Sequence, residues 1–375
     1  VQRACGPEPA PARADRPADV PPALISLDDL LLDVLRHPDV CSRRPLIEHY
    51  DCAVRGATVI PAGYADAGVI IVKRGGRLGV ALSVDGNPRY GALSAKQAAA
   101  LAVVESVRNV ASVGARPIGL TDCLNFGNPE DPVAFRQLAD GVDGLAEAAS
   151  SLRVTDEEEP LPFVSGNVSL YNESARGGAI APSAIVACIG RVEDVGRTVT
   201  MRLTGGDRRL LLFGPRSDAL GGSVIATVLG SAADELPAID YAEVNASVRV
   251  VVEGIRTGAV TAAHDISDGG LLACVAEMCL GGDADGTIGA RLTAPQVWAP
   301  DVSPIAALFG EAGGFVVEVA PEKLGHFEAI CTANDASPIA IGVSGGASLH
   351  VSGLCDVPLA ELAQAWTLPL RELYA

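Results

Sequence analysis

Apolar and polar positions along the chain alternate in a way that predicts strands followed by helices. Apolar runs of strand length occupy residues 66–73 and 78–86. Ser94 is suited to cap a helix over residues 95–113, which is rich in alanine and valine. A second helix is expected from Pro132, after which apolar side chains recur every three or four residues. This pattern predicts an α/β unit.

The same alternation continues through the rest of the chain. The segment PFVSG, with its apolar lead-in Phe163-Val164, predicts a buried strand. Further runs of the same kind predict strands at 178–194, 208–214 and 313–321 and helices at 240–258 and 271–280. A boundary between two units is expected near residues 192–197.

These expectations divide the chain into four parts. Residues 1–25, rich in proline, alanine and charge, are expected to be a flexible leader or a linker. Residues 26–195, which open with a helix capped by Ser26, form an N-terminal α/β domain, and residues 196–349 form a C-terminal α+β domain. Residues 350–375 are expected to be a C-terminal tail helix.

Composition narrows the possible partners and surroundings. The 375 residues are 49% hydrophobic but only 4% aromatic, which favours layered α/β structure. A net charge of −18 argues against nucleic acid as a partner, because no basic surplus is available for phosphates. The nine cysteines form no CxxC pair, which predicts a reducing, cytoplasmic location. No run of eighteen apolar residues predicts a membrane span.

Candidate chemistry lies where three expected strands of the first unit end. The end residues are Asp85, Asp122 and Asn167, and each is flanked by glycine and amide residues. In layered α/β folds, ligands gather at strand ends. Carboxylate and amide oxygens suit Mg²⁺, and nearby glycines let phosphates approach the backbone. The three strand ends together predict a Mg²⁺–nucleotide site, although each one alone is more typical of an ordinary turn.

A second polar segment, HDISDGG at 264–270, precedes an apolar helix. His264 has a side chain suited to proton transfer. However, Asp265, Ser267 and Asp268 are also residues that cap helices, so capping and packing are preferred over catalysis, with phosphate contact as the lesser alternative. The chain contains no GxSxG, P-loop, HExxH or Rossmann glycine motif.

Five segments of the chain carry a family resemblance: CSRRPLIEHYDCAVRGATVIPAG, ALSVDGNPRY, LTDCLNFGNPEDP, SGNVSLYNES and HDISDGGLL. On these segments the chain, from about residue 26 to its end, resembles the second half of the phosphoribosylformylglycinamidine synthases. Members of this family contain two copies of an aminoimidazole-ribonucleotide-synthetase-like unit, whose N-terminal domains pair with each other. The resemblance implies the same two-domain fold, here as one copy.

The resemblance also implies an activity. The family uses ATP to phosphorylate the amide oxygen of formylglycinamide ribonucleotide, and ammonia then displaces phosphate to give the amidine. The ammonia comes from a glutamine amidotransferase partner. By motif, Asp122 and Gly166 resemble ATP contacts, Asn167 an Mg²⁺ ligand and Ser169 a contact to the ribonucleotide substrate. Asn125, in the same loop as Asp122, and Asp265 are weaker candidates.

The family's catalytic residues have no counterpart here. In the first copy, a pattern like E-x-H-N-H-P supplies an acid and the catalytic histidine. Asp85 and Asn87 occupy that place in this chain, within DGNPRY, which has no histidine. The resemblance therefore implies no catalytic residue in this chain, and a site that a first-half subunit or domain completes. We expect the chain to be inactive alone.

Two other interpretations stay open. In one, the chain is a non-catalytic module for nucleotide binding and assembly, holding a structural nucleotide through Asp85 and its neighbours. In the other, it is a stand-alone homodimeric enzyme of the same superfamily. The chain lacks the glycine-rich leader loop and the reactive cysteine–lysine pattern expected of a selenophosphate enzyme, which disfavours that member of the superfamily.

Overall fold

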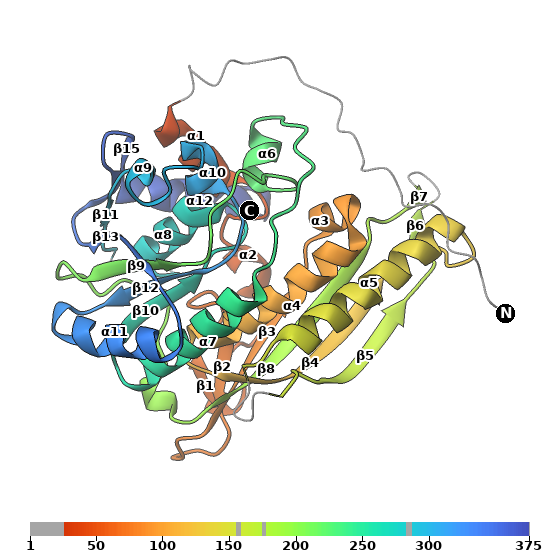
Figure 1. The fold of residues 1–375 in the computed structure, drawn as a ribbon, viewed down its shortest axis with the longest axis horizontal. Helices are drawn as coiled ribbons and strands as arrows, with labels where there is room; N and C mark the ends of the chain where they lie inside the picture. The colour runs from red at the N-terminus through yellow and green to blue at the C-terminus, as the bar shows by residue number, and fades with distance from the viewer. Residues whose placement is uncertain (1–25, 155–158, 175–177, 283–286, 375) are drawn as a thin grey trace.

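The computed structural model describes residues 26–374 except for 155–158, 175–177 and 283–286. The expected leader at 1–25 and most of an acidic loop at 155–160 lie outside the described residues. The described chain forms two α/β units, each built on one large sheet (Figure 1). None of its helices is long and apolar enough to cross a membrane.

The first unit contains a six-stranded sheet in the order β1-β2-β3-β8-β4-β5. Strands β4 and β5 run parallel, and the other neighbouring pairs are antiparallel. The strands are β1 (Thr58–Ile60), β2 (Gly68–Ile71), β3 (Gly79–Asp85), β8 (Ser183–Val192), β4 (Arg116–Asn125) and β5 (Phe163–Ser169), and β6 (Glu173–Ser174) pairs separately with β7 (Gly178–Ala179).

Helix α4 (Ala95–Ser112) packs on one face of this sheet, and α5 (Pro132–Ser151) packs beside α4 (Figure 1). We call the face that α4 covers the inner face and the opposite face the outer face. The hydroxyl of Ser94 accepts a hydrogen bond from the Gln97 amide, which confirms the expected cap. Helix α5 begins at Pro132, as expected, with Asp131 as its cap.

The second unit contains a seven-stranded sheet in the order β10-β12-β9-β13-β11-β14-β15. Its strands are β9 (Arg209–Phe213), β10 (Val260–Asp265), β11 (Ala290–Leu292), β12 (Phe315–Val319), β13 (Ile339–Ser344), β14 (Ser348–Val351) and β15 (Cys355–Pro358). The remaining helices of the described chain are α1 (Leu27–Arg36), α2 (Arg44–Ile47), η2 (Val54–Gly56), α3 (Pro88–Leu93), η3 (Val195–Arg197), α6 (Val224–Val228), α7 (Tyr241–Arg256), α8 (Gly270–Leu280), α9 (Pro295–Trp298), α10 (Pro304–Phe309), η4 (Pro321–Lys323), α11 (Leu324–Ala333) and α12 (Leu359–Tyr374).

One apolar core joins the two units. Val103 and Val107 on α4 belong to the same buried cluster as Val248 on α7 and Phe315 and Val317 on β12. All five side chains are almost completely buried. Helix α4 is therefore shared between the two units, and burial of its apolar surface stabilises their relative placement.

Two boundaries differ from the sequence-based expectations. Helix α1, expected within the N-terminal domain, packs with α12 and α8, and its Leu31 and Leu35 belong to the core of the second unit (Figure 1). The C-terminal helix begins at Leu359 and not at residue 350, because β14 and β15 form a hairpin there. The amphipathic pattern of α1 predicted its apolar face but could not indicate which core that face joins.

The close approach of α5 to α4 requires a glycine. A Cβ atom at Gly144 would lie 2.0 Å from the backbone carbonyl oxygen of Lys96. We expect Gly144→Ala to lower the free energy of unfolding by about 1–3 kcal/mol, because one of the helices must shift. Gly325→Ala in α11 is the control, since nothing lies within 4 Å of that position. Equal stability of the two variants in denaturant unfolding would contradict this packing.

Candidate functional site

Pairing between strands brings the three expected site positions to one level of the first sheet. Val186 on β8 pairs with Asp85 on β3 and with Asp122 on β4, and Asp122 pairs with Gly166 on β5. Neighbouring strands lie about 5 Å apart, so these positions form one row across the sheet. The structure therefore brings the three segments together, with Asn167 one residue beyond the row on β5. However, Asp122 and Asn167 lie within β4 and β5 and not at their ends, so the expectation of strand ends was wrong for these two residues.

Asp122 and Gly166 form the tightest contact in this row. A Cβ atom at residue 166 would lie 1.7 Å from Oδ1 of Asp122, so any other residue would require the Asp122 side chain to move from its present position. Partial burial raises the pKa of the Asp122 carboxyl above its ordinary value. Both residues face the inner side, because their neighbour in the row, Val186, is fully buried there.

Asn167 and Ser169 face the outer side, since successive residues of a strand alternate between faces. Asn167 is exposed, and its side chain makes no hydrogen bond with a described residue. The Ser169 hydroxyl lies 3.2 Å from the Asn172 side chain, which also donates to the Ser169 carbonyl oxygen. The four residues matched to ATP, metal and substrate contacts thus lie near one sheet edge but on two faces.

Strand β5 differs from its expected environment. Its five central residues are exposed, because β5 is the last strand of the sheet. The expectation of a buried strand was wrong. The apolar residues Val164 and Val168 indicated burial, but both are more than half exposed. The candidate site is consequently open on this side of the molecule.

The weaker candidates of the first unit make structural contacts. The Asn87 side chain caps α3 by accepting from the Arg89 and Tyr90 amides, and it also donates to Asp268. The Asn125 amide donates to the carbonyl oxygens of Cys123 and Ser183 within the sheet. These hydrogen bonds account for both amides without a ligand.

Asp85 and Asp265 belong to a second group of polar residues, which lies between the two units. Asp85 accepts from the Asn109 side chain at 2.7 Å, and its other carboxylate oxygen has no hydrogen-bond partner among the described residues. Asp265 is 2% exposed, and its Oδ2 likewise accepts no hydrogen bond from a described residue, although it lies 4.0 Å from Nη2 of Arg108. We call Asp66, Asp85, Glu105, His264 and Asp265 the buried acidic cluster.

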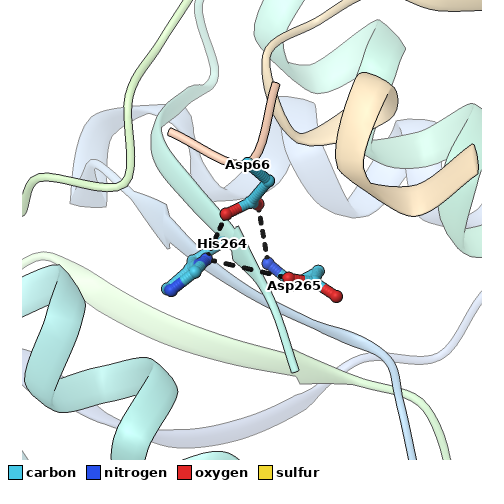
Figure 2. A group of neighbouring side chains, drawn as sticks. All are labelled: Asp66, His264 and Asp265. Atoms are coloured by element: carbon cyan, nitrogen blue, oxygen red, sulfur yellow. Dashed lines mark hydrogen bonds and ion pairs between the residues drawn. The ribbon is translucent and has the colours of Figure 1, made fainter. Parts of the chain in front are cut away.

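Figure 2 shows the centre of this cluster, where Asp66, His264 and Asp265 point toward one another. Nδ1 of His264 lies 2.5 Å from Oδ1 of Asp66. Nε2 of His264 lies 3.1 Å from Glu277. The Asp66 carboxylate also accepts from the backbone amide of Asp265.

The buried acidic cluster contains more carboxyl groups than basic groups. Repulsion among these carboxyl groups therefore adds to the effect of burial on their pKa values. Burial, followed by repulsion from neighbouring carboxylates, raises the pKa values of Glu105 and Asp265 to about 8. Burial opposes protonation of His264 most strongly, but attraction to Asp66 and Cys274, together with contacts to Asp66 and Glu277, raises its pKa well above the ordinary value. Arg108 of α4, whose nearest nitrogen is 4.0 Å from Asp265, partly offsets the acid.

This arrangement fits a divalent cation. Asp66, His264 and Asp265 each offer a ligand atom, and these atoms lie within 4.8 Å of one another. Asp85 and Asp265 each contribute an oxygen without a partner, and burying such atoms is unfavourable unless a ligand or water satisfies them. Oxygen-rich sites favour Mg²⁺ or Mn²⁺, and the histidine favours Mn²⁺ over Mg²⁺.

The expected role of the segment 264–270 was wrong in one respect. Helix α8 begins at Gly270, its cap is Gly269, and no side chain caps it. Asp268 instead pairs with Arg89, and His264 and Asp265 end strand β10 within the buried cluster. These polar residues therefore link the two units.

Two family models match most of the chain. The N-terminal domain of AIR synthase related protein matches residues 64–192, and the C-terminal domain of AIR synthase related protein matches residues 206–351. The chain belongs to the AIR synthase related proteins. This confirms the expected fold class of two successive synthetase-like domains.

Curated proteins with similar sequences show a more specific similarity than the two family models do. The chain is 40% identical over 352 residues to the phosphoribosylformylglycinamidine synthase subunit PurL of Methanothrix thermoacetophila, and 41% identical over 357 residues to that of Thermomicrobium roseum. These matches cover 92% and 94% of this chain but 45% and 46% of the relatives. The chain thus spans about half the length of these relatives, which confirms the resemblance to one half of such a subunit.

Solved structures support the fold. The structure titled T. maritima PurL complexed with FGAR has a TM-score of 0.69 at 18% identity, and the match covers 90% of this chain and 54% of that one. The crystal structure of a HypE–HypF complex has a TM-score of 0.53 at 14% identity, over 79% of this chain and 93% of that one. At these identities the likeness concerns the fold alone.

The buried acidic cluster predicts a specific pH dependence of stability. The folded pKa values of Glu105 and Asp265, about 8, and of Glu311, about 7, exceed those of unfolded chains. Between about pH 4.5 and 8 the folded state therefore binds more protons than the unfolded state, so stability falls as pH rises through this range.

We expect the Tm in EDTA to fall between pH 6 and pH 8.5, and Mg²⁺ or Mn²⁺ to raise it most at pH 8.5, because a cation binds the ionised cluster of the folded state. Differential scanning calorimetry at both pH values measures this. A Tm that rises with pH in EDTA would contradict the assigned pKa shifts.

Proposed function

We propose that this chain is the second half of an ATP-dependent phosphoribosylformylglycinamidine synthase, and that it acts in the cytoplasm. The observation that carries the proposal is identity of about 40% across nearly the whole chain to subunits of that name. The chain covers only about half of their length, so a second polypeptide or domain supplies the other half. The motifs LTDCLNFGNP and SGNVSLYNES, which lie on β4 and β5 and in the loops that follow them, support a contribution of this chain at the sheet edge.

The outer face of the first sheet supports pairing with such a half. It exposes large apolar side chains from several strands: Ile70, Leu82, Val84, Ile118, Val164 and Ile185. No helix of the described residues packs on this face. Large apolar side chains exposed together on one sheet face are typical of a protein–protein interface. A synthetase-like domain docked there would also face Asn167 and Ser169.

The four site residues have separate roles in this proposal. Asp122 and Gly166 contact ATP, with the glycine leaving the backbone accessible to phosphates. Asn167 is the ligand that would hold Mg²⁺, through its exposed amide oxygen. Bound Mg²⁺ supplies charge neutralisation for phosphoryl transfer. Ser169 donates a hydrogen bond to the ribonucleotide substrate.

The proposed reaction forms one C–N bond at the expense of ATP. The γ-phosphoryl group of ATP passes to the amide oxygen of formylglycinamide ribonucleotide, and ADP leaves. Ammonia then attacks the carbon of the phosphorylated amide, the C–O bond of that carbon breaks, and phosphate departs to give the amidine. The chain's own residues bind and orient the reactants, while the proton-transferring histidine comes from the first half.

Ammonia delivery involves a further partner in this proposal. A solved structure titled PurLQS from Thermotoga maritima contains a related fold over 92% of this chain. That title describes a multi-subunit assembly of the related protein. We assign a glutamine amidotransferase subunit to the same role here, with the first half as the direct partner of the outer face.

The proposal predicts that activity requires both halves. The purified chain with formylglycinamide ribonucleotide, ATP, Mg²⁺ and ammonium is expected to release no ADP above background. Addition of a first-half polypeptide that carries the HNHP-like motif is expected to start turnover, which saturates at a one-to-one ratio. A coupled ADP assay measures both. Turnover by the chain alone would contradict the proposal and favour the stand-alone homodimer.

Variants of this chain test whether its residues belong to the completed site. Asn167→Ala and Ser169→Ala are each expected to lower kcat/KM of the complex by about a hundredfold, because each removes a polar contact to a charged reactant. Ser337→Ala, an exposed position in the second unit, is the control. Unchanged activity in both site variants would remove these residues from the site.

A second candidate function is a non-catalytic module that binds a cation or nucleotide and stabilises the assembly. The observation in its favour is the buried acidic cluster, which links the two units and carries carboxylate oxygens without partners. Stabilisation by Mg²⁺ or Mn²⁺ without any turnover in the presence of a first half would favour this function.

A further inference from the structure

Tyr171 has an unusual backbone conformation at the edge of the candidate site. Its φ angle is +59°, in the left-handed region that bulky residues rarely adopt. Glycine or asparagine would occupy this region at lower cost. A strained residue next to a candidate site is a reason to look for a function that requires its side chain.

Hydrogen bonds on both sides hold this conformation in place. The Tyr171 amide donates to the carbonyl oxygen of Gly127, and the Asn172 amide donates to that of Phe126. The Asn172 side chain donates to the carbonyl oxygens of Ser169 and Phe126. The loops that follow β4 and β5 are therefore fixed to each other, and Tyr171 lies in the second of them.

The Tyr171 side chain is mostly exposed and contributes little to the packing of the described residues. It is 59% exposed, and its hydroxyl makes no hydrogen bond with a described residue. By contrast, Tyr90 is buried and donates its hydroxyl hydrogen to Glu311. Packing against the described residues therefore does not explain why a tyrosine occupies the strained position.

The position of Tyr171 along the sheet edge indicates which reactant it meets. Asp122 pairs with Gly166, and three residues further along both strands Asn125 pairs with Ser169. Three residues of a strand span about 10 Å. Tyr171 comes two residues after Ser169. It therefore lies farther than Ser169 from the row that contains Asp122 and Gly166. It is consequently at the substrate end of the site and away from the ATP end.

We infer that Tyr171 is a specificity-determining contact for the ribonucleotide substrate, an inference that rests on the proposed function. Its ring offers an apolar surface to the ribose, and its hydroxyl offers a hydrogen-bond donor to the phosphate or a sugar hydroxyl. The fixed loop holds the side chain ready before binding, which reduces the entropy lost when the substrate binds.

The test uses the complex of this chain with a first-half polypeptide, with formylglycinamide ribonucleotide and ATP varied separately. Tyr171→Ala is expected to raise KM for the ribonucleotide at least tenfold and to leave KM for ATP within twofold. Tyr171→Phe separates the hydroxyl from the ring and is expected to give an intermediate KM. Tyr374→Ala, an exposed tyrosine at the end of α12, is the control.

Tyr171→Gly removes the strain together with the side chain. We expect this variant to have a Tm equal to or above that of the wild type and the same high KM as Tyr171→Ala. An unchanged ribonucleotide KM in both variants overturns the inference. Loss of co-purification with the first half also overturns it, because Tyr171 would then be an interface residue. A wild-type complex without turnover overturns the proposed function and this inference together.

Discussion

Burial of helix α4 between the two units is the constraint on which the rest of the structure depends. Its apolar side chains join the first sheet to α7 and β12 in one core. The same helix carries Glu105, Arg108 and Asn109 into this interface, where they meet Asp85 and residues of β10. Apolar burial supplies the stability, and the polar residues fix how the two units are aligned.

This constraint separates two kinds of site in one chain. The buried acidic cluster is enclosed by both units, and its unpartnered carboxylate oxygens and raised pKa values suit a cation that stays bound. Asp122, Gly166, Asn167 and Ser169 lie instead at an open sheet edge beside an exposed apolar face. Such an edge is suited to reactants that enter and leave once another domain closes over it.

Much of the fold followed from sequence patterns. The caps at Ser26 and Ser94 were readable because local side-chain-to-backbone hydrogen bonds depend on neighbouring residues alone. The exposure of β5 could not be predicted from the sequence, since an apolar run does not reveal that its strand lies at the edge of a sheet. The placement of α1 also depended on tertiary packing. Among the site residues, the segments around Asp85, Asp122 and Asn167 were found, but their distribution over two faces requires the strand register.

The buried acidic cluster was missed as a unit because its members come from distant segments. One signal was nevertheless present in the sequence. Glu105, Arg108 and Asn109 recur at helical spacing within a helix that is otherwise rich in alanine and valine, and three polar residues on one buried stripe of a helix need partners. Asp265, at the end of a strand, lies 4.0 Å from Arg108 and so supplies one of those partners, which the capping interpretation did not recognise.

The central claim is that a second synthetase-like domain docks on the outer face and completes the site. Hydrogen exchange of the chain with and without a first-half polypeptide tests this directly. We expect slower exchange of backbone amides in β2 and β5 on mixing, because docking covers the edge strand β5 and the exposed outer side of β2, with little change in β12. Unchanged exchange in β2 and β5, in a mixture that turns over substrate, would contradict it.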